Sequence, residues 1–235
     1  MTIEIILREG QLTHPIVVLC KEENLEQVTT LLKLFTSSLD CAQELTSLSF
    51  TPNVKIDFTQ DNLKFQGRWL ADKKEIQVKN NLSLEKMLQT FIFELCNANN
   101  PDLISSKLKY SNFFTADEYA TYIEMAEHQS SKKAVLLYMN IVSINPEALT
   151  MPSTAELQQL KILSGDETYL AYIKNNGHYD NYINNYNKAM HKRNNLFSEQ
   201  NKNIFGKTPV NMNNTTFYLS HANSNEMTCF LLNFL

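Results

Sequence analysis

The sequence predicts an α+β fold, a small antiparallel sheet packed on amphipathic helices, followed by a helical region and a C-terminal hairpin. Strictly alternating runs such as Val54-Lys55-Ile56-Asp57-Phe58 are typical of half-buried strands. Other stretches place apolar residues three and four apart, which is the spacing of a helix face. The 235 residues are 43% hydrophobic, which is enough for one sizeable core.

The first elements are two strands and a helical region. Residues 3–7 and 15–20 are β-branched runs joined by a polar turn, so they predict a hairpin. From Glu23 the apolar spacing becomes helical, and the helix either continues to about Leu48 or breaks near Ser37-Ser38.

A second group of strands precedes a strongly apolar helix. Residues 54–58, 63–66 and 75–79 alternate and predict an antiparallel sheet. Ser83 is a suitable N-cap for a helix over 84–97, whose broad apolar face we expect to pack on that sheet together with helix 23–47.

The rest of the chain is predicted to be mainly helical. Thr115-Ala116-Asp117-Glu118 and Ser153-Thr154-Ala155-Glu156 are capping-box sequences, each opening a helix. Residues 168–198 carry tyrosines at helical spacing, interrupted at Asn176-Gly177, and these side chains are expected in the core. Strand-like runs within 216–232 predict a closing hairpin.

Three parts of one compact unit are expected. They are an α+β core over 1–128, a helical region over 129–200, and an Asn-rich loop with the closing hairpin over 201–235.

Composition excludes several classes of function. Five glycines cannot build a phosphate-binding loop, and no cofactor is expected. The net charge of −4 provides no basic field for nucleic acid. Four scattered cysteines form no CxxC pair, so a structural zinc ribbon is not expected.

The N-terminus lacks the basic and apolar regions of a signal peptide, and no apolar run reaches the length of a bilayer span. We therefore expect a cytoplasmic protein, or one secreted without a classical signal peptide, as some bacterial effectors are.

One helical segment carries a degenerate motif. Phe93-Glu94-Leu95-Cys96-Asn97 follows a strand-rich segment, and the arrangement over about 54–128 resembles the zincin metallopeptidase core. In that family a helix bears H-E-x-x-H, in which two histidines bind Zn²⁺ and the glutamate polarises a metal-bound water. The resemblance places Glu94 at the catalytic position, and places Phe93 and Asn97 where the histidines belong. We therefore expect no metal.

If a metal is bound, the sequence offers three other ligands. Glu118 follows at a plausible distance for the third zincin ligand, although it also completes a capping box. Glu124-Met125-Ala126-Glu127-His128 is similar to an inverted H-x-x-E-H motif whose first histidine is replaced by glutamate. The i,i+4 spacing of Glu124 and His128 is also that of an ordinary surface pair, which is how we interpret it.

A second resemblance concerns cysteine proteases. Asn175-Asn176-Gly177-His178-Tyr179-Asp180 looks like the histidine segment of ovarian-tumour-type or papain-like proteases, in which a histidine activates a thiolate. Cys41 is the cysteine best placed near a predicted helix start, where the helix dipole favours a thiolate.

These observations predict a non-catalytic protein-interaction module, or effector-like protein, on a degenerate zincin-like scaffold. It should bind a protein partner, should not bind nucleic acid and should not span a membrane. The alternative is a hydrolase, either a metallopeptidase with atypical ligands or a cysteine protease that uses Cys41 and His178.

Overall fold

The computed structural model describes residues 1–8, 12–104, 107–153, 165–174 and 178–205. Its elements follow one another in this order: β1 (Thr2–Leu7), β2 (Ile16–Lys21), η1 (Glu22–Asn24), α1 (Leu25–Thr36), α2 (Leu39–Ser49), β3 (Lys55–Gln60), β4 (Gly67–Leu70), β5 (Glu75–Lys79), α3 (Leu84–Asn99), η2 (Tyr110–Asn112), α4 (Ala116–Ile144), α6 (Asp166–Lys174) and α7 (His178–Phe205).

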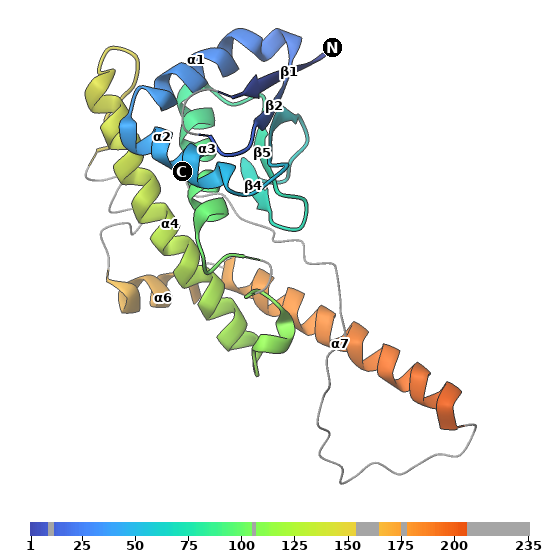
Figure 1. The fold of residues 1–235 in the computed structure, drawn as a ribbon. Helices are drawn as coiled ribbons and strands as arrows, with labels where there is room; N and C mark the ends of the chain where they lie inside the picture. The colour runs from blue at the N-terminus through green and yellow to red at the C-terminus, as the bar shows by residue number, and fades with distance from the viewer. Residues whose placement is uncertain (9–11, 105–106, 154–164, 175–177, 206–235) are drawn as a thin grey trace.

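The strands form one five-stranded mixed sheet in the order β1-β2-β3-β5-β4 (Figure 1). β1 and β2 are the expected antiparallel hairpin, with Thr2 opposite Lys21. β3 runs parallel to both β2 and β5, and β4 returns antiparallel to β5. The α+β class is confirmed.

Two details of the predicted sheet are wrong. The sheet is mixed rather than antiparallel, because a helical crossover separates β2 from β3 and brings them together in parallel. Residues 63–66 form no strand, and the strand begins instead at Gly67. Alternation over so few residues does not distinguish a strand from the loop that leads into it.

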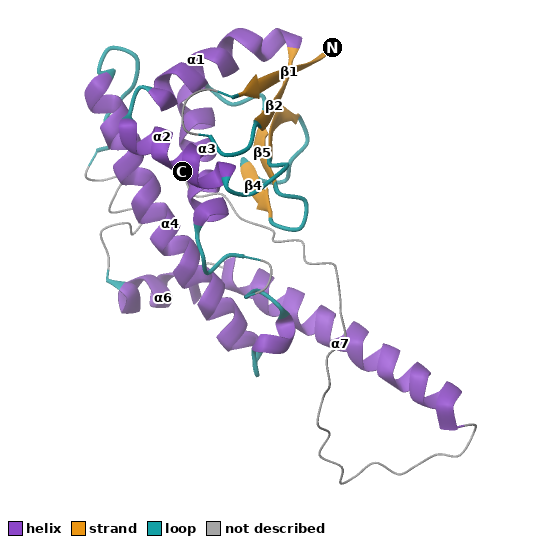
Figure 2. Cartoon of the chain, viewed as in Figure 1, coloured by secondary structure: helices purple, strands orange, loops and turns teal. Residues whose placement is uncertain are grey.

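The helical region between β2 and β3 breaks where the two serines stand. α1 ends at Thr36 and α2 begins after Ser38, whose extended backbone precedes the helix. The predicted helix after Ser83 is α3, which packs directly on β4 and β5. Figure 2 shows α1, α2 and α3 gathered on one side of the strands.

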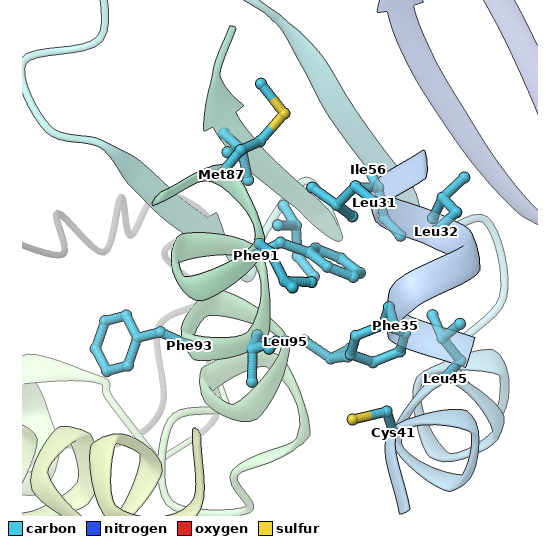
Figure 3. Close-up of a cluster of buried hydrophobic side chains, with 14 of the residues drawn as sticks. Leu31, Leu32, Phe35, Cys41, Leu45, Ile56, Met87, Phe91, Phe93 and Leu95 are labelled. Carbon is cyan, nitrogen blue, oxygen red and sulfur yellow. The ribbon is translucent and has the colours of Figure 1, made fainter. Parts of the chain in front are cut away.

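The first hydrophobic core lies between the sheet and these helices. The Phe91 ring of α3 lies 5.0 Å from Phe35 of α1 and 5.9 Å from Phe58 of β3, measured between ring centroids. Figure 3 shows Phe91 and Phe35 facing each other at the centre of this core, whereas Phe93 points away from them. Aromatic pairs at these distances add to the free energy of burial.

A second hydrophobic core joins the N-terminal half of α4 to α6 and α7. Tyr169, Tyr179, Tyr182 and Tyr186 are buried there, which confirms that the predicted aromatic ladder is core. The C-terminal half of α4 belongs to the first core, so the 29-residue helix connects the two. α7 extends beyond the body of the protein (Figure 1).

Some expectations stay predictions. α4 runs unbroken through the expected boundary at 128/129, and α7 runs through the one at 200/201. The helix predicted after the second capping box, within 154–164, and the hairpin within 216–232 lie outside the described residues. No helix among the residues that the structure describes has the length and apolar character needed to cross a membrane.

Gly67 allows β4 and α3 to approach each other closely. A Cβ at this position would lie 2.6 Å from Cγ2 of Thr90 and 3.0 Å from the backbone oxygen of Gln77. Gly67→Ala should therefore lower the free energy of unfolding by about 1–3 kcal/mol, because a β-branched side chain and a strand would have to move. Gly165→Ala is the control, since a Cβ there meets nothing within 4 Å. Urea unfolding should show a clear loss for the first variant only; equal effects would contradict the prediction.

Candidate functional site

The degenerate motif lies on α3 and is buried. Ser83 caps the helix by accepting a hydrogen bond from the Lys86 backbone N–H at 3.3 Å. Ten to fourteen residues later, Phe93, Glu94 and Asn97 are all shielded from solvent, with Glu94 only 2% exposed. Glu94 and Asn97 therefore place polar groups in the protein interior, beside the apolar face of α3.

Two donors hold the Glu94 carboxyl group. Nδ2 of Asn97 donates at 3.3 Å to Oε2, and the backbone N–H of Trp69 also donates to this carboxyl. The Trp69 N–H lies on the outer edge of β4, so Glu94 satisfies a backbone group that the sheet leaves open. The position of Glu94 beside the apolar face of the helix predicts a partly buried carboxyl with donors from the neighbouring strand or from Asn97 and Thr90; the structure buries it almost completely.

Burial controls the protonation of Glu94. The loss of solvent raises its pKa from 4.5 to about 8, against the smaller opposing effects of the Asn97 and Trp69 hydrogen bonds. Glu94 is therefore mostly a neutral carboxylic acid at pH 7. Oδ1 of Asn97 is buried and has no hydrogen-bond partner among the described residues.

α4 contributes three more ionisable side chains. Glu124, Glu127 and His128 are all buried, and Glu124 and His128 are fully so. The prediction that Glu124 and His128 form a surface pair is wrong, because α6 and α7 cover this side of α4. A spacing of four residues establishes only that two side chains share a helix face.

Two tyrosines from the covering helices contact these groups. The ring of Tyr169 stacks on His128, with centroids 3.7 Å apart and planes at 11°, and its hydroxyl reaches Oε2 of Glu124 at 3.5 Å. The Tyr182 hydroxyl donates to Oε1 of Glu127 at 2.5 Å. The tyrosines thus supply polar contacts inside an otherwise apolar interface.

Glu94, Glu124 and Glu127 form what we call the buried glutamate cluster. Burial raises the pKa of Glu127 well above its ordinary value, and the charges of Glu124 and then Glu94 raise it further, while the Tyr182 hydrogen bond lowers it. No ion pair among the described residues includes Glu94 or Glu127. Like charges close together in a dry environment oppose one another's ionisation, which is why the pKa of Glu127 rises beyond the effect of burial alone.

Glu118 is not part of this cluster. It lies exposed at the start of α4, where its N–H donates to Oγ1 of Thr115 and its Oε2 accepts from the Phe114 N–H at 2.9 Å. Thr115 therefore caps the helix as predicted, while the Glu118 carboxylate binds the N–H of the residue before the cap. Of the three alternative ligands, the structure therefore brings Glu124 and His128 together and separates Glu118. The described residues contain no group of three His, Cys, Asp or Glu side chains placed to hold a metal ion.

Cys41 lies in the first core, near the N-terminus of α2. Its Sγ is 3.9 Å from the backbone oxygen of Leu137, and burial raises the pKa of the thiol to about 11. The thiol is therefore protonated at neutral pH, whereas a nucleophilic cysteine needs a thiolate. His178 begins α7, the helix that packs in the second core.

Sequence reasoning did not assign Glu127, Tyr169, Tyr182 or Trp69 to the site. Glu127 lies within the inverted motif that the sequence suggested. It follows Tyr119 and Ile123 at intervals of four residues, so it shares their buried helix face, and this spacing indicates burial. The tyrosines were assigned to the core, but their acidic partners lie about 45 to 55 residues away in sequence. Comparisons with models of protein families, with curated proteins and with solved structures found no significant match.

The Glu94 pKa makes stability depend on pH. In the unfolded chain the group titrates near 4.5, so the folded state holds the proton from there to about pH 8. Its stabilisation is complete below pH 4.5 and is lost as pH rises towards 8. Glu94→Gln should flatten this decline, and near pH 6 it should cost less than Glu94→Ala, which should cost about 1–3 kcal/mol. Urea unfolding at pH 5.5, 7 and 8.5 measures both, with exposed Glu26→Gln as control. Identical pH slopes in the wild type and Glu94→Gln would contradict this account.

The Tyr182–Glu127 hydrogen bond should matter more as pH rises. Tyr182→Phe removes the donor that favours ionised Glu127, so its cost, about 1–3 kcal/mol, should grow from the lowest to the highest pH at which the protein stays folded. Tyr186→Phe is a matched control on the same helix, because that hydroxyl donates at 2.9 Å to the neutral carbonyl of Phe113. The cost of Tyr186→Phe should stay constant over this range. Thermal melts at each pH measure both costs, and an equal dependence on pH for the two variants would contradict the interpretation.

Proposed function

We propose that this chain is a non-catalytic protein-interaction domain, built on a zincin-like scaffold that has lost its metal site. The observation that carries the proposal is the state of Glu94. A general base must reach water or substrate and must be ionised. Glu94 is enclosed, hydrogen-bonded by Asn97 and the Trp69 N–H, and mostly neutral at pH 7. These are the properties of a structural residue that joins α3 to the edge of the sheet.

The side chains at the former ligand positions support the same conclusion. Phe93 has no donor atom, and the amide of Asn97 is used to hold Glu94. An amide oxygen is also a poor ligand for zinc, which prefers nitrogen and sulfur.

An exposed apolar surface supports a role in binding a protein. Leu39 of α2 and Leu136 and Ile144 of α4 are 73%, 63% and 54% exposed. Nδ2 of Asn140 donates to Oδ2 of Asp40 at 2.8 Å, which ties the two helices together between these side chains. We call Leu39, Leu136 and Ile144 the α2–α4 surface. Its large exposed apolar side chains suit an apolar segment of a partner protein.

A hydrolase is the second candidate, and the convergence of Glu94, Glu124, Glu127 and His128 favours it. Enzymes gather titratable groups in this way, and raised pKa values are common among them. The burial of all four groups distinguishes this cluster from an open active site.

Metal analysis tests the loss of the zinc site. Purified protein, dialysed against zinc and then against buffer, should contain well below one equivalent of zinc per chain in elemental analysis, because phenylalanine and asparagine stand at the ligand positions. A stable equivalent that Glu124→Gln or His128→Ala removes would instead favour an atypical metallopeptidase.

Activity assays separate the two candidates. Wild-type protein should show no hydrolysis of a general peptide library, and Glu94→Gln should not differ from it. Wild-type hydrolysis that Glu94→Gln abolishes, while the fold is retained, would overturn the non-catalytic proposal. The same assay with Cys41→Ser tests the cysteine-protease alternative.

The α2–α4 surface is tested with a charge at one of its three apolar positions. Leu136→Glu should abolish binding of a partner identified by affinity purification and reconstituted from purified components. Phe114→Glu is the control, because Phe114 is equally apolar and 94% exposed but precedes α4. Equal binding by both variants would show that the partner uses another surface.

A further inference from the structure

The two edges of the sheet differ in how they are covered. At β4 the outward N–H of Trp69 is taken by Glu94, and α3 packs against the strand. At β1, no strand among the described residues pairs with the outer side (Figure 1). An open edge strand is a template for pairing with another chain.

The hydrogen-bond pattern shows which β1 residues face outward. The Glu22 N–H donates to the Met1 oxygen at 2.9 Å, and Met1 is in register with Glu22. In an antiparallel ladder the residues that exchange bonds alternate, so Met1, Ile3, Ile5 and Leu7 bond to β2. The N–H and C=O groups of Thr2, Glu4, Ile6 and the following Arg8 therefore point towards the open edge.

We propose that the occupant of this edge is a second copy of the chain, paired antiparallel to β1 about a two-fold axis at Ile6. In this register Glu4 of each copy lies opposite Arg8 of the other, and Ile6 lies opposite its own counterpart. All three residues are outward-bonding and exposed on the same face of the sheet. The edge is therefore complementary to itself in charge as well as in hydrogen bonding.

Other two-fold registers of the outward-facing residues lack this match. An axis at Glu4 places two glutamates directly opposite each other, which is destabilising. An axis at Ile5 places Glu4 opposite Ile6, so neither Glu4 nor Arg8 faces a residue of the other charge. Only the axis at Ile6 forms two Glu–Arg pairs.

Apolar contacts strengthen this register on both faces. Ile6 is 43% exposed and lies beside half-buried Val17, so two copies bring four aliphatic side chains together. On the opposite face, Ile5 and Leu7 are partly buried and pack at the rim of the first core. In the dimer, Ile5 of each copy would lie opposite Leu7 of the other. Pairing therefore extends the core as well as the sheet.

Charge exchange on the full chain tests the register. By sedimentation and light scattering over a concentration series, the wild type should reach twice the 27.1 kDa of one chain. Glu4→Arg and Arg8→Glu should each raise the dissociation constant about tenfold or more, since each creates two like-charge pairs. The double variant Glu4→Arg/Arg8→Glu should restore it. Exposed Glu147→Arg matches the charge change of the first variant and should leave the dimer intact.

Each other outcome overturns the proposal. A wild type that stays monomeric at all concentrations excludes the pairing, and a dimer indifferent to both single variants uses another surface. A dimer that the singles weaken but the double variant does not restore has another register. Thermal melts of each variant confirm that β1 remains folded. Leu136→Glu should leave the dimer unchanged, so this test is separate from that of the α2–α4 surface.

Discussion

The hydrogen bond from the Trp69 backbone N–H to the Glu94 carboxyl connects the edge of the sheet to the helical half of the protein. It depends on Gly67, whose missing side chain lets β4 approach α3, and on Asn97, which donates to the same carboxyl. Because it places a carboxyl group in the interior, further polar groups must be arranged around it. The buried glutamate cluster and its tyrosine partners meet this requirement, and no lysine or arginine in the described part of the chain pairs with Glu94 or Glu127.

Burial favours protonated carboxyl groups in this interior. It raises the pKa of Glu94 to about 8 and that of Glu127 well above its ordinary value. A carboxylic acid can both donate and accept hydrogen bonds, whereas a carboxylate only accepts. Neutral glutamates are thus suited to a helix interface that contains tyrosine hydroxyls.

The sequence was informative wherever one residue's environment is local. The hairpin, the Ser83 cap and the helix start at Thr115 all depend on neighbours a few residues away, and these predictions are confirmed. The sequence left open whether the first helical region continues or breaks near Ser37-Ser38, and the structure shows the break. The parallel pairing of β3 depends on a crossover, and the burial of Glu124 and His128 depends on α6 and α7. Periodicity within one helix contains no information about which distant helix covers it.

The continuity of α4 makes the two cores mechanically interdependent. A helix of 29 residues is a rod of about 43 Å, with one end in each core. If the tyrosine core opened, the N-terminal half of α4 would lose its packing, and Glu127 would lose the burial that raises its pKa. A disturbance at one end of the rod would therefore change the proton affinity of a side chain near its middle.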